Sequence, residues 1–367
     1  MPRFRAFPGI RYGAVDLAQV TAPPYDVIDD AERDALMRRH PHNVVHIDLP
    51  RGGPHPYADA AAAFAVWRRD GVLLTDEASL YLYRMTANGE ATLGVIGALG
   101  IEEPGHGDVL PHEHTTPKAK SDRLDLLRAT HANLSAVWGL SLAAGLSKLL
   151  DLESALLLGR WTDDDGVEHE LWRIHDADTI ARIVESASSA PVVIADGHHR
   201  YETCLAFSRE RAELSGADAT LCFLVELAPD QLTVKPIHRL LRGVTIGDLE
   251  TALDRDYELD GGDDSGLALL TPQGRRALRR RRDDDEIDPV VLDRALALLP
   301  PHELIYQHGS ENVERAVREG AADAAVLLRP VTVEQITRYA NARDRMPPKS
   351  TFFWPKPRSG TVFRSLD

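Results

Sequence analysis

The stretch APVVIADGHHRYETCLAFS, residues 190–208, decides the fold class of this chain. It opens with an apolar run at 190–195, which has the length and composition of a buried strand. Polar residues and a glycine occupy 196–200, and from Tyr201 onward the apolar residues recur at helical spacing. We therefore predict a strand, a turn and a helix in direct succession, and with them a mixed α/β fold.

The turn at 196–200 has the composition of a phosphate site. A helix N-terminus offers free backbone N–H groups and a positive dipole end, so it attracts anions. Gly197 lets the backbone approach a ligand, His198 and His199 add donors, and Arg200 can hold a phosphate with two parallel hydrogen bonds. Asp196 can hold Mg²⁺ or orient a histidine. The structural alternative makes Asp196 a helix N-cap in a solvated turn, but ligands of α/β proteins bind at such strand ends.

The composition is that of an ordinary globular protein, with 43% hydrophobic and 27% charged residues among 367. The formal net charge of −15 argues against nucleic acid or an anionic membrane as the main partner, because bulk phosphate binding needs a basic surface. Residues 1–13 lack the apolar core of a signal peptide, and no apolar run is long enough to span a bilayer. We expect a cytoplasmic protein in which Cys204 and Cys222 are buried free thiols.

Strand and helix patterns alternate along the whole chain and divide it into three sections. Residues 1–105 form an N-terminal α/β section, 106–242 a core that contains the turn, and 243–367 a C-terminal α/β section. The pair Asn88-Gly89 predicts a β-hairpin in the first section.

Three further local predictions concern the second and third sections. A leucine-rich helix is expected to begin near Gly145. The run RRALRRRRDDDEID at 275–288 is expected to be a solvated loop or helix end, because like charges repel one another in a compact element. The aromatic residues in the tail at 346–360 predict that this tail packs back onto the body.

A second stretch with functional chemistry spans residues 110–135. Glu113 lies between His112 and His114, and the cationic residues Lys118, Lys120 and Arg123 follow within ten positions. Carboxylate, imidazole and cationic groups together suit proton abstraction from a hydroxyl beside a polyphosphate. The alternative is a mobile loop with scattered polar residues.

The histidines of the two stretches also allow a metal centre. His112 and His114, with Asp196, His198 and His199, could bind zinc or a dinuclear centre and make the protein a metal-dependent hydrolase. Against this hypothesis, the histidines do not have the spacing that places two ligands on one helix face.

Weaker signals come from three other motifs. Tyr25 and Asp26 follow two prolines and could point into a pocket, although a structural role explains them equally well. His238, in KPIHRLL at 235–241, is expected on a strand face opposite Lys235 and Arg239, either as a core histidine or in the site. The motif PPKSTFF at 347–353 offers Lys, Ser and Thr side chains that can contact phosphate.

The order P-H-E followed by D-G-H-H-R resembles that of the free serine kinases in the ParB/sulfiredoxin-like superfamily. The motifs APPYDVI, HEHT…KSDR, DGHHRY, PIHRLL, LLRPVTVEQI and PPKSTFF resemble an uncharacterised bacterial and archaeal family of the same superfamily, over nearly the whole chain. The resemblance implies a ParB/sulfiredoxin-like core within 106–242.

The kinase resemblance implies a reaction, the transfer of phosphate from ATP or ADP with Mg²⁺ to free L-serine, which gives O-phosphoserine. Glu113 matches the proposed catalytic base, and the turn at 196–200 matches the segment that binds the nucleotide phosphates. We expect His114 and Asp196 to be catalytic as well, with Asp196 on the metal. The expected roles of the remaining candidates are phosphate contacts for Lys118, Lys120 and Arg123, and acceptor binding for Tyr25, Asp26 and His238.

Two alternatives to a kinase stay open, the metal-dependent hydrolase and a non-catalytic nucleotide-binding regulator of the ParB-like kind. The expected partners are a nucleotide and a small-molecule substrate, with neither nucleic acid nor membrane. The sequence leaves the oligomeric state open, with a homodimer as one expectation.

Overall fold

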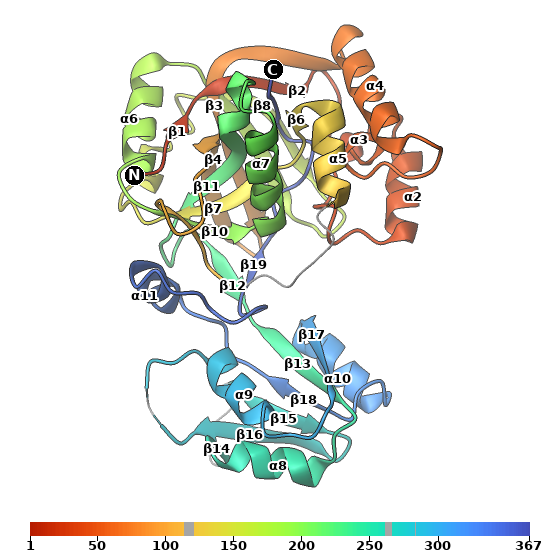
Figure 1. Ribbon diagram of the computed structural model, residues 1–367, viewed down its shortest axis with the longest axis vertical. Coiled ribbons are helices and arrows are strands. Elements are labelled where there is room, and N and C mark those ends of the chain that lie inside the picture. The colour runs from red at the N-terminus through yellow and green to blue at the C-terminus, as the bar shows by residue number, and fades with distance from the viewer. Residues whose placement is uncertain (114–120, 261–265, 283) are drawn as a thin grey trace. The chain divides into compact units, whose positions relative to one another are not determined.

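A computed structural model gives the fold of the chain (Figure 1) and describes residues 1–113, 121–260, 266–282 and 284–367. These residues form two compact units. Unit 1 contains residues 1–111, 121–233 and 355–367, and unit 2 contains residues 112–113 and 234–354. The three-section division of the sequence stays a prediction.

Unit 1 is built on a mixed sheet. Its strands are β1 (Phe4–Arg5), β2 (Phe7–Tyr12), β3 (Leu73–Ala87), β4 (Glu90–Gly100), β5 (Val109–Pro111), β6 (Ala132–Asn133), β7 (Val137–Ser141), β8 (Leu156–Thr162), β9 (Glu168–Ile174), β10 (Val192–Asp196), β11 (Ala219–Glu226) and β20 (Phe363–Ser365). Neighbouring strands follow the order β5-β10-β7-β11-β4-β3-β2-β20-β6, while β1 pairs with β4 and β9 joins β8 to β3. The pairs β10–β5 and β11–β7 are parallel, and the other pairs are antiparallel.

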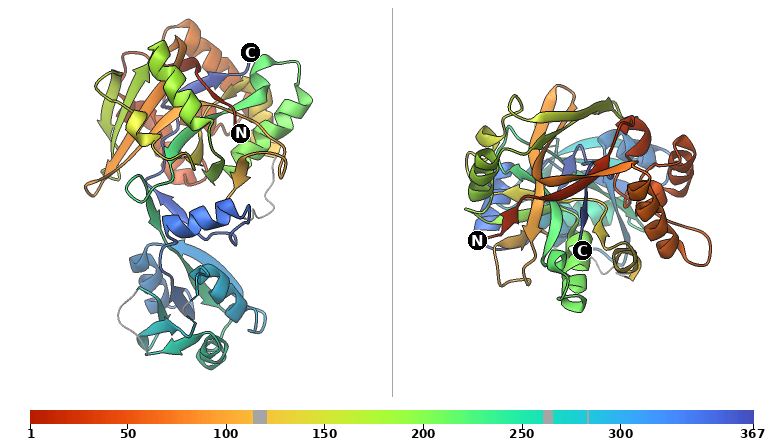
Figure 2. Two further views of the ribbon diagram at one scale, coloured as in Figure 1. Left: turned by 90° about the vertical axis from the view of Figure 1, so that its left-hand side faces the viewer. Right: turned by 90° about the horizontal axis from the view of Figure 1, so that it is seen from above.

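Helices pack around this sheet. They are α1 (Leu17–Val20), α2 (Asp30–Arg39), α3 (Val45–Asp48), α4 (Pro56–Arg69), α5 (Ser121–Thr130), α6 (Ala177–Ala187) and α7 (His198–Glu210). In Figure 1, α5 and α7 run side by side, and the two helices contact each other. Helices together with parallel and antiparallel strands confirm the predicted mixed α/β class. Both chain termini lie in unit 1 (Figure 2).

The predicted hairpin at Asn88-Gly89 joins β3 to β4. Asn88 has φ 52° and Gly89 has φ 81°, as a two-residue turn between twisted strands requires. Ala87 pairs with Glu90 directly across the turn. Local turn chemistry was therefore sufficient to predict this pairing.

The predicted leucine-rich helix near Gly145 is wrong. The segment forms only a 3₁₀ turn at Ser147–Leu149, and the chain then enters β8. The carboxylate of Glu226, at the end of β11, accepts hydrogen bonds from the backbone N–H groups of Gly145 (2.7 Å) and Ser147 (2.8 Å) and from the Ser147 hydroxyl (2.6 Å). This tertiary contact holds the segment in a turn despite its helical composition.

Unit 2 contains a second sheet with the strand order β14-β16-β15-β18-β13-β17. Its strands are β13 (Ile237–Arg242), β14 (Tyr257–Leu259), β15 (Ala268–Thr271), β16 (Gly274–Arg280), β17 (Glu303–His308) and β18 (Ala324–Leu327), while β12 (Thr233–Lys235) pairs with β19 (Phe352–Trp354). Its helices are α8 (Ile246–Asp254), α9 (Asp288–Leu296), α10 (Ser310–Arg318) and α11 (Val333–Asn341).

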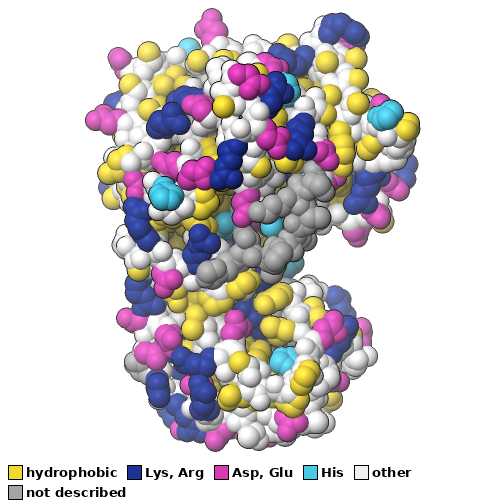
Figure 3. All heavy atoms as spheres, viewed as in Figure 1, with side chains coloured by type: hydrophobic (Ala, Val, Ile, Leu, Met, Phe, Trp, Pro, Cys, Tyr) yellow, Lys and Arg dark blue, Asp and Glu magenta, His cyan; other side chains and the backbone are white. Residues whose placement is uncertain are grey.

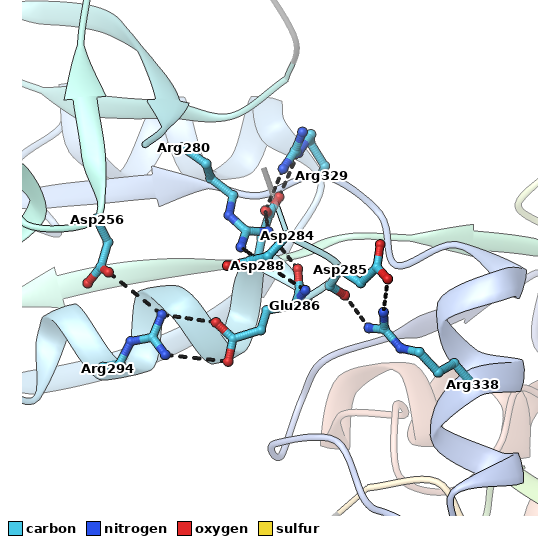
Figure 4. A network of polar contacts seen from close by, with 9 residues as sticks. All are labelled: Asp256, Arg280, Asp284, Asp285, Glu286, Asp288, Arg294, Arg329 and Arg338. Atoms are coloured by element: carbon cyan, nitrogen blue, oxygen red, sulfur yellow. Dashed lines mark hydrogen bonds and ion pairs between the residues drawn. The ribbon is translucent and has the colours of Figure 1, made fainter. Parts of the chain in front are cut away.

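Part of the charged run at 275–288 is a strand and not the expected solvated loop or helix end. Its residues up to Arg280 belong to β16. Figure 4 shows the carboxylates around Arg280, the one β16 arginine that it draws. Arg280 pairs with Asp284 and lies 3.9 Å from Asp288, which is buried and also accepts two hydrogen bonds from Arg329 (2.7 and 2.8 Å). Ion pairs with carboxylates therefore stabilise a strand that repulsion between its arginines alone would disfavour.

Basic side chains gather on unit 2 beside β14 and β16 (Figure 3). With Thr332 and Gln335 at the start of α11, the arginines at 279–282 line a groove of about 750 Å³. Arg279 pairs with Glu258, and Arg281 Nη2 lies 2.6 Å from an Asp254 carboxylate oxygen. Neighbouring carboxylates thus compensate much of the positive charge along this groove.

The residues of the C-terminal tail belong to both units, up to Trp354 in unit 2 and from Pro355 in unit 1. Phe353 on β19 is buried, and beyond the tail β20 pairs with β2 and β6 inside unit 1. That the tail packs back onto the body stays a prediction. Cys204 and Cys222 are buried free thiols, which agrees with the prediction. None of the helices within the described residues combines the length and the apolar character that a bilayer crossing requires.

Candidate functional site

The predicted strand–turn–helix is present in unit 1. β10 lies between β5 and β7, and α7 begins two residues after Asp196. Gly197 is the N-cap residue of α7 and has φ 90°, a left-handed conformation that glycine adopts without strain. A Cβ atom at this position would lie 2.8 Å from Arg200 Nε. Glycine therefore allows the Arg200 side chain to fold back over the turn, and Gly197 rather than Asp196 takes the N-cap position.

Two cations hold the Asp196 carboxylate at the end of β10. Arg200 pairs with one oxygen and also donates to the backbone carbonyl of Ala136, while Lys356 Nζ lies 2.8 Å from the other oxygen. Burial raises the pKa of Asp196, but the charges of Arg200 and Lys356 outweigh it and lower the pKa to about 2. The carboxylate is therefore ionised at neutral pH and fixed between two cationic groups.

A second layer of charged and aromatic side chains surrounds this ion triad. Lys356 Nζ lies 3.7 Å from an oxygen of Asp26, and Arg123 Cζ lies 4.2 Å from the centre of the Tyr25 ring. Arg123 Nη1 also donates to the backbone carbonyl of Asp48 (2.6 Å) and lies 3.3 Å from its carboxylate. Burial raises the pKa of Tyr25, and the positive charges of Arg200 and Arg123 oppose this shift.

The structure thus brings together five of the residues predicted from sequence, and they come from three segments far apart in the chain: Tyr25, Asp26, Arg123, Asp196 and Arg200. Sequence reasoning missed Asp48 and Lys356. The only local signal for Lys356 was its position between Pro355 and Pro357, in a tail predicted to pack back.

The two histidines of the turn lie in the first turn of α7, and both are partly buried. His199 Nδ1 lies 3.7 Å from a carboxylate oxygen of Glu202, one helical turn further on. Their predicted phosphate contacts stay predictions.

A small cavity opens beside Arg200, among residues of α3, α5, β6, α7 and β11. Its volume is about 50 Å³. Asp48, Arg123 and Arg200 form its charged side, and Leu126, Leu127 and Cys204 lie on its apolar side. Both predicted arginines therefore border the same cavity.

The predicted catalytic base belongs to unit 2. Glu113 Oε2 accepts a long hydrogen bond from the backbone N–H of Ser350 (3.4 Å), and His112 Nε2 lies 2.8 Å from the hydroxyl oxygen of Thr351. His112 and Glu113 of the P-H-E motif therefore pack against the PPKSTFF motif inside this unit.

The PIHRLL motif contributes a buried arginine to the same unit. Arg239 is completely buried, donates to the backbone carbonyls of Ile237 (2.8 Å) and Lys349 (3.2 Å), and lies 3.7 Å from Asp293. Burial, together with the neighbouring Arg239 charge, lowers the pKa of His238 to about 4. His238 Nδ1 accepts a hydrogen bond from the backbone N–H of Leu328 (3.0 Å), so the neutral ring is built into the sheet.

Three predicted residues, His114, Lys118 and Lys120, lie outside the described residues. Their proposed roles stay predictions.

In the described parts of the chain, no group of three or more His, Cys, Asp or Glu side chains could hold a metal ion.

Several solved structures are weakly similar to this chain. A free serine kinase in complex with AMP is 14% identical, with a TM-score of 0.41, and the match covers 71% of this chain and 88% of the kinase. SbnI with a C-terminal truncation, from Staphylococcus aureus, is 10% identical, with a TM-score of 0.45 and coverage of 72% and 85%. A conserved hypothetical protein from Pyrococcus furiosus is 12% identical, with a TM-score of 0.40 and coverage of 70% and 90%. Similarity of this degree does not by itself assign an activity.

No curated protein matches the chain. Residues 4–298, well over half of its length, match a family model whose description is "Protein of unknown function (DUF1015)". The chain therefore belongs to the DUF1015 family.

Proposed function

We propose that this protein is a nucleotide-dependent phosphotransferase that acts on a small hydroxylated metabolite. The observation that carries the proposal is the pair of cations, Arg200 and Lys356, that contact Asp196 at the end of β10, directly before α7. Free L-serine is the first acceptor to test, because the motifs resemble those of the free serine kinases.

The start of α7 suits the phosphates of a nucleotide. The first backbone N–H groups of a helix have no partner within the helix, and the dipole favours negative charge there. Gly197 has no side chain with which to cap these groups. Arg200 can donate hydrogen bonds to two phosphate oxygens. Arg123 and Arg200 border the same small cavity.

Asp196 suits a magnesium ion that accompanies the phosphates. Mg²⁺ commonly takes one or two carboxylates and completes its shell with phosphate oxygens and water. The low pKa of Asp196 keeps its carboxylate ionised, and Asp26 lies in the same cluster. When bound, Mg²⁺ would offset the charge of the phosphates. We propose Asp196 as its ligand.

The proposed base is Glu113, which would take the proton from the acceptor hydroxyl. General bases of this kind typically contribute about 10²- to 10⁴-fold to a rate. The hydrogen bond from the Ser350 amide supports an oriented carboxylate at this position. His114, Lys118 and Lys120 are proposed to assist the transfer, and Tyr25, Asp26 and His238 to bind the acceptor.

The test is ³¹P NMR of the protein with Mg²⁺, ATP or ADP, and amino acids led by L-serine. We expect a new phosphomonoester resonance that is lost in Asp196→Asn and Glu113→Gln. Consumption of nucleotide without a phosphomonoester would point to a hydrolase. Intact nucleotide that nevertheless binds tightly would contradict the transferase and favour a nucleotide-binding regulator.

A further inference from the structure

The C-terminal segment 355–367 is an integral part of unit 1, although the family match ends at residue 298. Its strand β20 pairs with β2 through Arg364 and Phe363, and with β6 through Arg364 and Ser365. The Phe363 side chain is fully buried. The segment is thus fastened at its end, several residues beyond Lys356.

A series of buried polar contacts holds the same segment in place next to Lys356. Arg358 is 6% exposed, and its Nη1 lies 3.2 Å from Oδ2 of Asp163. Asp163 contacts Nε2 of His169 (3.0 Å), and Nδ1 of that ring lies 2.9 Å from the hydroxyl of Tyr83. The Tyr83 hydroxyl accepts a hydrogen bond from the backbone N–H of Arg358 (3.3 Å), so the polar contacts begin and end at Arg358.

These anchors bring Lys356 to the turn at the end of β10. Its side chain is 17% exposed, and its ammonium group lies between the carboxylates of Asp196 (2.8 Å) and Asp26 (3.7 Å). Pro355 and Pro357 restrict the backbone on both sides. An ammonium group that the fold already holds beside the proposed phosphate site loses little further freedom when a phosphate binds.

We propose that Lys356 is a phosphate-binding residue of the nucleotide site, and that Arg358, through its ion pair with Asp163, is the residue that positions it. The inference rests on the proposed function. A phosphate oxygen competes with the carboxylates for the ammonium group, and the flexible lysine stem lets that group turn from one to the other. The C-terminal segment is then required for nucleotide binding.

The test compares the affinities of the full-length protein for ADP and for adenosine, with Mg²⁺ present, by isothermal titration calorimetry. We expect Lys356→Met to weaken ADP binding at least tenfold and to leave adenosine binding unchanged, because adenosine has no phosphate. Lys148→Met, an exposed lysine of the same unit, is the matched control and should bind both ligands as the parent protein does.

The positioning role has its own variants. Arg358→Met should reduce the ratio of ADP affinity to adenosine affinity, and Arg358→Lys should retain part of that ratio. Loss of packing alone would instead weaken the binding of both ligands to the same degree. An unchanged ADP affinity in Lys356→Met would overturn the inference while the proposed function stands. Absence of ADP binding by the parent protein would overturn the proposed function, and this inference with it.

Discussion

The guanidinium of Arg123 lies over the ring of Tyr25, with 4.2 Å between Cζ and the ring centre, so α5 is joined to the N-terminal turn that carries Asp26. The same guanidinium donates to the backbone of Asp48, at the end of α3. One side chain therefore links three segments of unit 1 beside the proposed phosphate site.

Arg123→Met should lower the free energy of unfolding by about 1–3 kcal/mol, because it removes a charge-assisted hydrogen bond and a cation–π contact. Urea unfolding measures this loss. The control is Arg38→Met on α2, an exposed arginine, which should stay within about 0.5 kcal/mol of the parent protein. Equal effects of the two substitutions would contradict the linking role of Arg123.

Gly197→Ala should destabilise the protein by about 1–2 kcal/mol, because φ 90° is unfavourable for a residue with a Cβ atom. The new methyl group would also displace the Arg200 side chain, so nucleotide binding should weaken. Gly247→Ala is the matched control, because Gly247 lies in α8 with open space around its Cβ position. That substitution should leave stability unchanged or raise it by up to about 1 kcal/mol. Thermal unfolding separates the two outcomes.

Asp196 should contribute stability that depends on pH. Its pKa is lowered to about 2 in the folded protein and lies at about 3.9 in an unfolded chain. The unfolded state therefore binds a proton first, so the contribution is complete above about pH 4 and disappears as the pH falls toward 2. The size is about 2 kcal/mol. The difference in unfolding free energy between parent and Asp196→Asn, measured from pH 5 to pH 2, should shrink by this amount, and a constant difference would refute the lowered pKa.

Asp288 should be the critical carboxylate of the network in Figure 4. It is 6% exposed and accepts two hydrogen bonds from Arg329, so Asp288→Asn removes a charge-assisted pair, although the Arg329 side chain is 42% exposed and Arg280 keeps its pair with Asp284. We expect a loss of about 1–3 kcal/mol in the unfolding of unit 2. Asp285→Asn removes a carboxylate that is 93% exposed in its pair with Arg338, and it should cost less than about 1 kcal/mol. Hydrogen exchange of unit 2 amides would measure the loss of stability in each variant, and equal losses would contradict the larger role of Asp288.

Sequence patterns were reliable where the cause is local. The apolar run before Asp196 and the helical spacing after it predicted β10 and α7, since strand and helix periods follow from backbone geometry. The pair Asn88-Gly89 predicted its hairpin for the same reason, because few residues accept positive φ. By contrast, the segment after Gly145 has the composition of a helix, but contacts with Glu226 make it a turn.

The sequence by itself therefore determined the α/β class and the strand–turn–helix around Gly197. It also predicted a phosphate contact for Arg200, which stays a prediction. Only the tertiary structure decided that Lys356 contacts Asp196, 160 positions away, and that Asp163 holds the tail through Arg358. Local rules act over a few residues, through backbone sterics and side-chain periodicity. Contacts between distant residues depend on the order of strands in the sheet and on buried charges that must find partners, and no short stretch of sequence contains that information.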